Sequence, residues 1–209
     1  MFKLSTKPAG SPANAEQETD AALVAAARRR DERACFRIWS RYAPLVFRLI
    51  RAYSGIRADN DDLAQEVFLR VFSRIDDVRD PDALRGFVAS ICLGVARNAN
   101  RRTRVRSILK LSNAEDWPEV PAPVVEDEPR RAIRHLMALL TTSASDEDRS
   151  LFLCRYVEKM DISDVAVAHG MSLGTAKRRV ARMTRRISRA MERDAVLAEY
   201  ASQLTRKGS

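Results

Sequence analysis

The sequence has little glycine, little proline and few aromatic residues: 7 Gly, 8 Pro and 6% Phe, Trp and Tyr in 209 residues. No run alternates between apolar and polar residues for long enough to indicate a β-strand. Apolar residues recur instead at helical spacing. These absences predict an all-α fold, and a chain of this length fits two small helical domains better than one large one.

Cysteine and histidine are also scarce, which bears on metal and catalytic sites. Cys35, Cys92 and Cys154 lie far apart in apolar helical contexts, so we interpret them as small buried residues in a reducing compartment. His135 and His169 are the two histidines, and the sequence has no metal-ligand cluster, glycine-rich phosphate loop or nucleophile with a nearby base. We therefore predict no metal, no cofactor and no catalytic residue, in a protein that is not an enzyme.

No apolar run approaches transmembrane length, and residues 1–19 lack the apolar stretch of a secretory signal. We therefore predict a cytoplasmic protein that does not insert into a membrane. Residues 1–19 are rich in Ser, Thr, Pro, Ala and Gln, which is typical of a disordered leader. Positive charge is in excess, with a net charge of +9 at pH 7. Such a charge favours a polyanionic partner, and nucleic acid is the first candidate.

The pattern of residues 161–189 predicts a helix-turn-helix. A short helix over residues 161–168 is followed by His169 and Gly170, and the glycine can adopt the left-handed conformation at a helix end. Ser172 is a favourable N-cap for a second helix. One face of that helix is apolar at helical spacing, through Leu173, Ala176, Val180, Met183 and Ile187.

The other face of the second helix is cationic. Solvated helix faces usually mix the two signs of charge, yet no acidic residue lies between Ser172 and Arg189. Unmixed positive charge is what phosphate neutralisation and contact with base edges in a major groove require. We therefore predict that this helix contacts DNA. Its basic residues are Lys177, Arg178, Arg179, Arg182, Arg185, Arg186 and Arg189.

Upstream helices are predicted over residues 21–30, 32–53, 61–74 and 81–104. Pro81 suits the first position of the last one, after a charged loop over residues 75–81. The second of these helices is expected to turn inward Phe36, Trp39, Tyr42, Val46, Phe47 and Ile50. The third is expected to bury Leu63, Val67, Phe68, Val71 and Phe72.

Between residues 112 and 129 the composition shifts to Glu, Asp, Pro and Ala with no basic residue, which indicates a flexible acidic linker. Trp117 lies within it, and both an anchor on a partner and packing on a domain remain open for this residue. Helices follow over residues 132–140 and, from a capping box at Ser145, to residue 156; residues 191–203 can extend the last helix. The predicted organisation is a disordered leader (1–19), a helical domain (20–106), an acidic linker (107–129) and a second helical domain ending in the helix-turn-helix (130–209).

Two motifs resemble those of the extracytoplasmic-function group of bacterial sigma factors, the small two-domain specificity subunits of RNA polymerase. Residues 61–72, DDLAQEVFLRVF, look like the family's acidic polymerase-binding helix, and residues 174–179, GTAKRR, look like its recognition-helix motif. The resemblance covers about residues 20–187. It implies a sigma region 2-like domain, a sigma region 4-like domain, and core RNA polymerase and promoter DNA as partners. Anti-sigma proteins that hold the chain inactive are common in the family.

The resemblance also implies a role for three sets of residues. Polymerase binding falls to Asp61, Asp62, Gln65, Glu66 and Leu69. Capture and opening of the start-proximal promoter element fall to Asp77, Val78, Arg79, Asp80, Phe87, Ser90, Asn98 and Arg101. Recognition of the start-distal element as duplex falls to Ser172, Leu173, Thr175, Lys177, Arg178, Arg179 and Arg182.

Several positions depart from the family pattern. Asn98 stands where many relatives have Asp, and residues 92–94 are Cys-Leu-Gly where most have a polar run, so the melted sequence stays open. Arg178 replaces a small residue and should alter sequence preference rather than abolish binding. His169 stands where a Leu usually packs, and we interpret it as a partly buried structural residue of the turn.

Two further interpretations stay open. Acidic residues in the first turn of a helix interact favourably with the helix dipole, whatever the function of the helix. Gln65 and Leu69 lie on the same exposed stripe as these acids, and the helix dipole does not explain their presence there. The alternative function is a stand-alone helix-turn-helix regulator, whose first domain would sense a ligand or form a dimer. Such regulators usually bind paired half-sites as dimers, and the sequence shows no heptad stripe or ligand-pocket signature.

Overall fold

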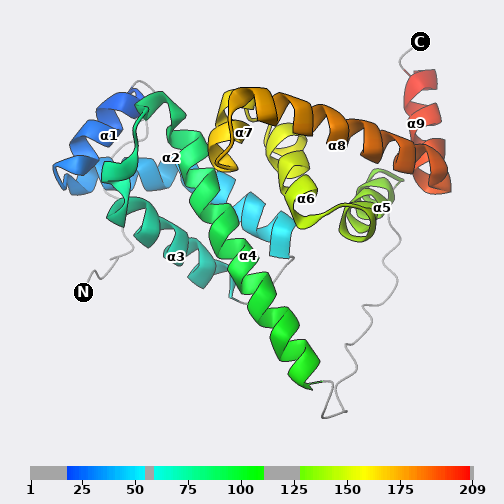
Figure 1. Cartoon of the computed structure of the whole chain (residues 1–209), viewed down its shortest axis with the longest axis horizontal. Coiled ribbons are helices and arrows are strands. Elements are labelled where there is room, and N and C mark those ends of the chain that lie inside the picture. Colours follow the sequence, from blue (N-terminus) through cyan, green and yellow to red (C-terminus); the bar gives the residue numbers. More distant parts are fainter. Residues whose placement is uncertain (1–17, 55–58, 111–127, 208–209) are drawn as a thin grey trace.

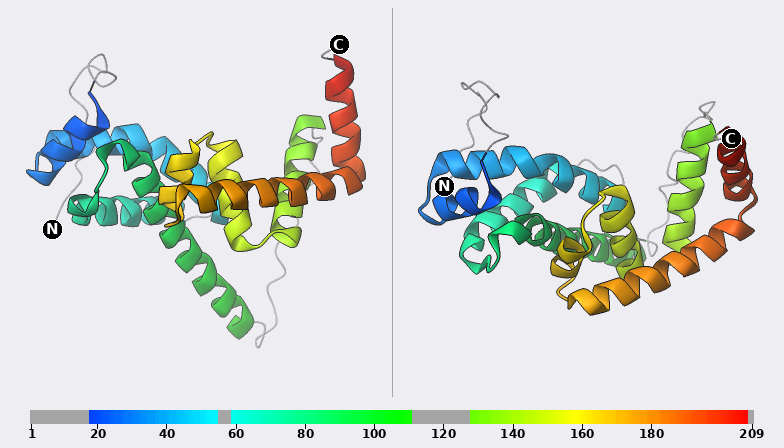
Figure 2. Two further views of the ribbon diagram at one scale, coloured as in Figure 1. Left: turned by 45° about the horizontal axis from the view of Figure 1, so that its top comes forward. Right: turned by 90° about the horizontal axis from the view of Figure 1, so that it is seen from above.

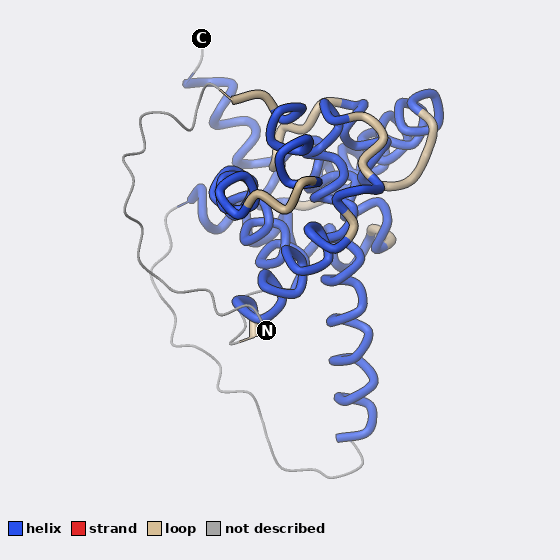
Figure 3. Tube along the Cα trace, turned by 90° about the vertical axis from the view of Figure 1, so that its left-hand side faces the viewer, coloured by secondary structure: helices blue, strands red, loops and turns tan. Residues whose placement is uncertain are grey.

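The computed structural model describes residues 18–54, 59–110 and 128–207. Every regular element of these segments is a helix, which confirms the expected all-α fold (Figure 1, Figure 3). The predicted leader as far as residue 17, and residues 111–127 of the predicted linker with Trp117, lie outside the described residues.

The first half contains α1 (Asp20–Arg28), α2 (Glu32–Ser54), α3 (Asn60–Ser73) and α4 (Leu84–Lys110). Helix α2 packs against α1, α3 and α4, and α3 also packs against α4 (Figure 1). Aliphatic side chains fill the space between them, and Leu23, Ile38, Leu49 and Leu84 are fully buried. The packing leaves one face of α3 and one face of α4 outside this four-helix core.

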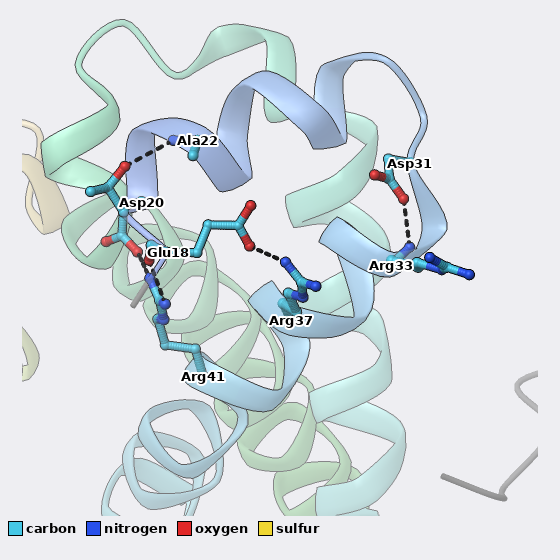
Figure 4. A network of polar contacts seen from close by, with 8 residues as sticks. Glu18, Asp20, Ala22, Asp31, Arg33, Arg37 and Arg41 are labelled. Carbon is cyan, nitrogen blue, oxygen red and sulfur yellow. Dashed lines mark hydrogen bonds and ion pairs between the residues drawn. The ribbon is translucent and has the colours of Figure 1, made fainter. Parts of the chain in front are cut away.

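Polar contacts tie the start of α1 to α2 (Figure 4). Arg41 donates hydrogen bonds to the Asp20 carboxylate at 2.5 Å and to the Glu18 carbonyl at 2.7 Å. Arg37 pairs with the Glu18 carboxylate. Burial, and a hydrogen bond to Asp20, raise the pKa of Tyr42 far above its usual range, so this phenol stays neutral.

Three aromatic residues of α2 are not in the core, contrary to the sequence prediction. Phe36, Trp39 and Phe47 are 52%, 40% and 37% exposed, whereas the other three expected positions are buried. A helix in a bundle buries one stripe, which here passes through Ile38, and apolar residues beyond that stripe stay outside. Phe36 stacks on Trp39, and Trp39 contacts Phe68 of α3, with ring centroids 5.8 and 6.4 Å apart.

The charged loop between α3 and α4 contains two short 3₁₀ helices, η2 (Ile75–Asp77) and η3 (Pro81–Ala83). The Asp80 carboxylate caps η3 by accepting a hydrogen bond from the Asp82 amide at 3.0 Å. Helix α4 therefore begins at Leu84 rather than at Pro81. It also continues past the expected end near residue 104 to Lys110, and its last turns extend beyond the other helices (Figure 1, Figure 3).

The second half contains α5 (Glu128–Ser143), α6 (Asp146–Phe152), the π-helical turn η4 (Leu153–Val157), α7 (Ile162–Ala168), α8 (Leu173–Arg193) and α9 (Ala195–Lys207). As expected, Ser145 caps α6, accepting a hydrogen bond from the Asp148 amide at 3.1 Å. Helix α9 is not an extension of α8, contrary to expectation. The backbone is extended at Asp194, whose carboxylate accepts a hydrogen bond from the Leu197 amide at 3.0 Å and starts a new helix. Helix α9 packs beside α5 (Figure 2).

The two halves are in contact. Helix α7 packs across α4, and η4 touches α2 (Figure 1, Figure 2). One buried cluster joins Leu93 of α4 to Leu153, Met160 and Val165 of the second half. This contact places the first helix of the α7–α8 pair directly against the first half.

Candidate nucleic-acid interface

The turn between α7 and α8 is built from local hydrogen bonds. Gly170 has φ of 60°, and the Met171 amide donates to the Ala166 carbonyl at 3.0 Å. The Ser172 hydroxyl accepts from the Thr175 amide at 3.3 Å, which makes Ser172 the N-cap of α8. These contacts fix the direction in which α8 leaves the turn.

Helix α8 has one buried stripe and one exposed cationic stripe. Ala176, Val180, Met183 and Ile187 are buried, at steps of three or four residues. The residues that lie opposite them, because α-helices have 3.6 residues per turn, are exposed arginines. This stripe, the arginine stripe, consists of Arg178, Arg182, Arg185 and Arg189.

One flank of α8 is paired with acids from the start of α6. Arg179 forms an ion pair with Glu147, and Arg186 forms one with Asp148 at 2.6 Å. No acid lies between Ser172 and Arg189 in sequence, and the acids that pair with this part of α8 come from another helix. Arg179 is therefore restrained by a carboxylate, unlike the exposed Arg178 of the arginine stripe, which faces Thr175 of its own helix.

The other flank of α8 borders an open groove of about 540 Å³. Lys177 and Arg185 line it together with Tyr156, whose hydroxyl lies 2.8 Å from the Thr184 hydroxyl. Positive charge thus continues from the arginine stripe onto this flank. At the start of the helix Leu173 is 45% exposed, as a residue that contacts a partner would be.

The loop assigned to the start-proximal element is only partly accessible. Arg79 and Asp80 are exposed, and Asp77 is exposed but ion-paired with Arg74 at 2.9 Å. Val78 is 3% exposed, and its carbonyl accepts a hydrogen bond from Arg28. The side chain of Val78 is therefore an anchor of the loop in this conformation and does not face a nucleic acid.

The assigned residues of α4 share one side of that helix. Phe87 and Ser90 are half-buried, and Asn98 and Arg101 are exposed. Helical geometry directs all four within about a quarter turn of one another. Sequence analysis assigned no role to Arg97, which lies on the edge of this side and donates a hydrogen bond to the Ser150 hydroxyl of α6 at 3.2 Å. The cluster of basic residues at the end of α4 was the signal for it.

Helix α3 carries an acidic face. Asp61, Asp62, Gln65 and Leu69 are exposed, and Leu69 is 57% exposed. The fifth assigned residue, Glu66, is half-buried and forms an ion pair with Arg70 one turn later. The opposite face of α3 lies in the core. The sequence prediction placed these side chains on a solvent-facing stripe, and their exposure agrees with it.

The cysteines and His169 take structural positions. Cys92 and Cys154 are fully buried, and burial raises the pKa of both thiols, that of Cys154 to about 12. Cys35 is half-buried. The Nδ1–H of His169 donates a hydrogen bond to the Val165 carbonyl at 2.9 Å, and burial lowers the pKa of His169. The described segments hold no cluster of His, Cys, Asp and Glu suited to a metal ion. In the same segments, no helix has the length and apolar character needed to cross a membrane.

Comparison with known proteins finds similarity to one family. The Sigma-70 region 2 family model matches residues 38–106, which contain α3, the loop and most of α4. The ECF RNA polymerase sigma factor SigE of Mycolicibacterium smegmatis is 29% identical over 149 residues, 68% of this chain and 55% of SigE. RNA polymerase sigma factor NccH of Alcaligenes xylosoxydans xylosoxydans is 25% identical over 171 residues, 80% of this chain and 91% of NccH. Together these similarities support an ECF sigma factor.

A solved structure supports the fold of this sigma factor. The structure of CnrH in complex with the cytosolic domain of CnrY matches with a TM-score of 0.62 at 19% identity, covering 85% of this chain and 100% of that one. The ECF family acts in transcription initiation, and sigma factors are not enzymes. The chain spans little more than half of SigE, 55% of its length, but 91% of NccH.

Proposed function

We propose that this sigma factor binds core RNA polymerase and directs initiation at a specific promoter. The first half (20–106) acts as a region 2-like domain that binds the polymerase and opens the start-proximal element. The second half (130–209) acts as a region 4-like domain that recognises the start-distal element as duplex. The observation that supports this most is that one chain presents the acidic face of α3 and the arginine stripe of α8, both uncovered.

The acidic face of α3 suits a protein partner. Asp61 and Asp62 would be repelled by DNA phosphates, whereas a cationic groove on the polymerase attracts them. Leu69 lies exposed among them and adds apolar contact area. Trp39 of α2, which contacts the buried Phe68 of α3, is 40% exposed and is a further accessible apolar side chain of this half.

The exposed side of α4 suits a single strand. An opened duplex offers bases that stack on aromatic rings and phosphates that need cations. Phe87 supplies a ring, and Arg101 supplies an exposed charge on the same side of the helix. Within the loop, Arg79 and Asp80 are the residues that can meet a flipped base. In this proposal Val78 anchors the loop rather than contacting DNA.

The start of α8 suits the major groove of a duplex. The exposed residues Leu173, Lys177, Arg178 and Arg182 can reach base edges or phosphates when the helix enters the groove. Arg179 can join them once it leaves Glu147. The arginine stripe continues to Arg189, beyond the depth of one groove, so its last members suit phosphates.

An inhibitory protein belongs to the proposed partners. CnrH, which shares this fold, was solved with the cytosolic domain of CnrY bound. We extend a partner of that kind to this chain, and we place its action in the cytoplasm, where polymerase and promoter meet.

Reconstitution tests the proposal. The purified chain is mixed with core polymerase and genomic DNA, and the 5′ ends of the transcripts are sequenced. We expect transcripts that begin at a defined set of promoters, and weak duplex binding by the chain alone. A chain that ignores polymerase and selects a site tightly as a free dimer is instead the stand-alone regulator.

A further inference from the structure

The loop between α3 and α4 is held from one side by helix α1. Helix α1 packs against both 3₁₀ helices of this loop, η2 and η3 (Figure 1). Val78 is the C-terminal cap of η2, and carbonyl groups at the end of a helix lack partners within it. Arg28, in the last turn of α1, donates a hydrogen bond to the Val78 carbonyl across 50 residues of sequence. The charge of an arginine strengthens such a bond.

The position of Arg28 is fixed by the turn that follows it. Arg30 has φ of 65°, a left-handed conformation that is uncommon in residues other than glycine. Its amide donates a hydrogen bond to the Ala27 carbonyl at 2.9 Å, and the Asp31 amide donates one to the Ala26 carbonyl at 3.2 Å. Both alanines are buried in the core of the first half. The last turn of α1, which carries Arg28, is therefore tied to that core.

The hydrogen bond from Arg28 also orients the next residue of the loop, Arg79. The carbonyl that Arg28 binds belongs to the peptide group that joins Val78 to Arg79, and peptide groups are planar. Burial of the Val78 side chain keeps the loop against the core, and the hydrogen bond sets the rotation of that peptide plane. On the far side of Arg79, the Asp80 carboxylate is engaged by the Asp82 amide at 3.0 Å. Arg79 is thus an exposed residue between two restrained ones.

We infer that Arg28 is a positioning residue for the start-proximal promoter element, because it holds the loop in the orientation in which Arg79 faces a flipped base. The inference rests on the proposed function of this loop. Binding sites require their side chains to be held within about 0.5 Å of the productive geometry by the contacts around them. Arg28 supplies such a contact from outside the loop and need not touch DNA itself. Its loss should therefore reduce the preference for the opened sequence more than the overall affinity for DNA.

Binding of the holoenzyme to two promoter fragments tests this role. The chain is combined with core polymerase, and the first labelled fragment carries a promoter found by the reconstitution described above. Its start-proximal element is kept open by a non-complementary opposite strand, so that melting does not contribute to the measurement. The second fragment has the same opened segment in scrambled sequence. The ratio of the two dissociation constants, measured by fluorescence anisotropy, gives the selectivity for the opened sequence.

We expect Arg28→Ala to lower this selectivity about tenfold, the order expected when a hydrogen bond from a charged donor is lost. Arg28→Lys keeps the charge and a donor on a different stem, so it should recover part of the selectivity. Arg29→Ala is the matched control, because it removes the same charge from the next residue, which is also exposed. This control should weaken binding to both fragments by the same factor and keep the selectivity of the parent.

Equal selectivity in Arg28→Ala and Arg29→Ala overturns the inference when the parent discriminates between the fragments. A parent holoenzyme that binds both fragments equally overturns the proposed function of the loop, and the role of Arg28 falls with it. Thermal melts by circular dichroism show whether each variant is folded. If Arg28→Ala is destabilised, Arg28→Met and Arg29→Met are compared in its place, because methionine keeps the helix propensity and the apolar stem of arginine without its donors. The same equality in this pair overturns the inference.

Discussion

Glu147 restrains Arg179, a basic residue of α8, and under the proposed function neutralising Glu147 should change how the protein binds duplex DNA. The Arg179–Glu147 pair is exposed, with 42% and 48% of the two side chains accessible. Such surface pairs contribute about 0–1 kcal/mol to stability. An acid in the first turn of a helix adds about 0.3–1 kcal/mol through the helix dipole. Glu147→Gln should therefore leave the chain folded and make Arg179 available to a phosphate.

The magnitude follows from counterion release. Each additional phosphate contact steepens the slope of log K against log salt concentration by about 0.9. Between 50 and 200 mM salt, one extra contact therefore adds a loss of about threefold to fourfold in affinity. Glu147→Gln should bind random duplex more tightly than the parent at the low end of this range, and the advantage should shrink at the high end.

Fluorescence anisotropy of a labelled random duplex across that salt range measures the slope. Asp146→Asn is the matched control, because Asp146 also lies in the first turn of α6 but pairs with Arg149 of the same helix at 3.4 Å. The control should keep the parent slope. An unchanged slope in Glu147→Gln would refute the reasoning, since it would show that a released Arg179 does not reach phosphate.

Three further expectations concern the other sites. Arg178→Ala should weaken promoter binding by about 1–3 kcal/mol and relax preference at one base position in a selection from random duplexes; a uniform loss across sequences would make Arg178 a phosphate contact instead. Asp62→Lys should reduce co-purification with core polymerase while circular dichroism stays that of the parent, because an exposed carboxylate contributes little to folding; undiminished co-purification would remove α3 from the polymerase site. Because the pKa of His169 is lowered in the folded chain, His169 binds a proton more readily when the chain is unfolded. The contribution of His169 to stability is therefore complete above about pH 6.5 and declines as the pH falls below that value. Thermal melts from pH 7.5 to 5.5 should show this decline in the parent and a shallower one in His169→Gln, and equal slopes would contradict it.

Sequence predicted the elements whose determinants are local. The N-cap at Ser172, the turn at Gly170 and the buried stripe of α8 each depend on residues within one helix or turn of one another, and the structure has all three. The exposed stripe of α3 with Gln65 and Leu69 is of the same kind. Periodicity within a single helix carries this information, so no knowledge of the packing was needed.

Packing between distant segments decided what sequence did not predict. Trp39 is an apolar residue of the kind usually found in a core. Helix α2 buries the neighbouring stripe of residues instead, so Trp39 stays partly exposed. Val78 stands alone among charged residues, and burial of that one side chain fixes the loop. Arg179 meets Glu147 across 32 residues of sequence. In each case the partner lies on another element, and periodicity within one segment does not report it.

The interface around Glu158 combines apolar contacts with a buried carboxylate, and the two contribute differently to the packing of the halves. A core of aliphatic side chains loses free energy in proportion to the apolar area that opening exposes to water. A buried carboxylate behaves differently, because its desolvation cost in the closed form is comparable to what it gains from its cationic partners. When α7 leaves α4, Glu158 regains water and Arg48, already 57% exposed, loses little. Separation of the helices would therefore regain, through hydration of Glu158, much of the free energy that the lost contacts contributed. Removal of Arg48 alone takes away the charged partner of Glu158 and leaves its carboxylate buried.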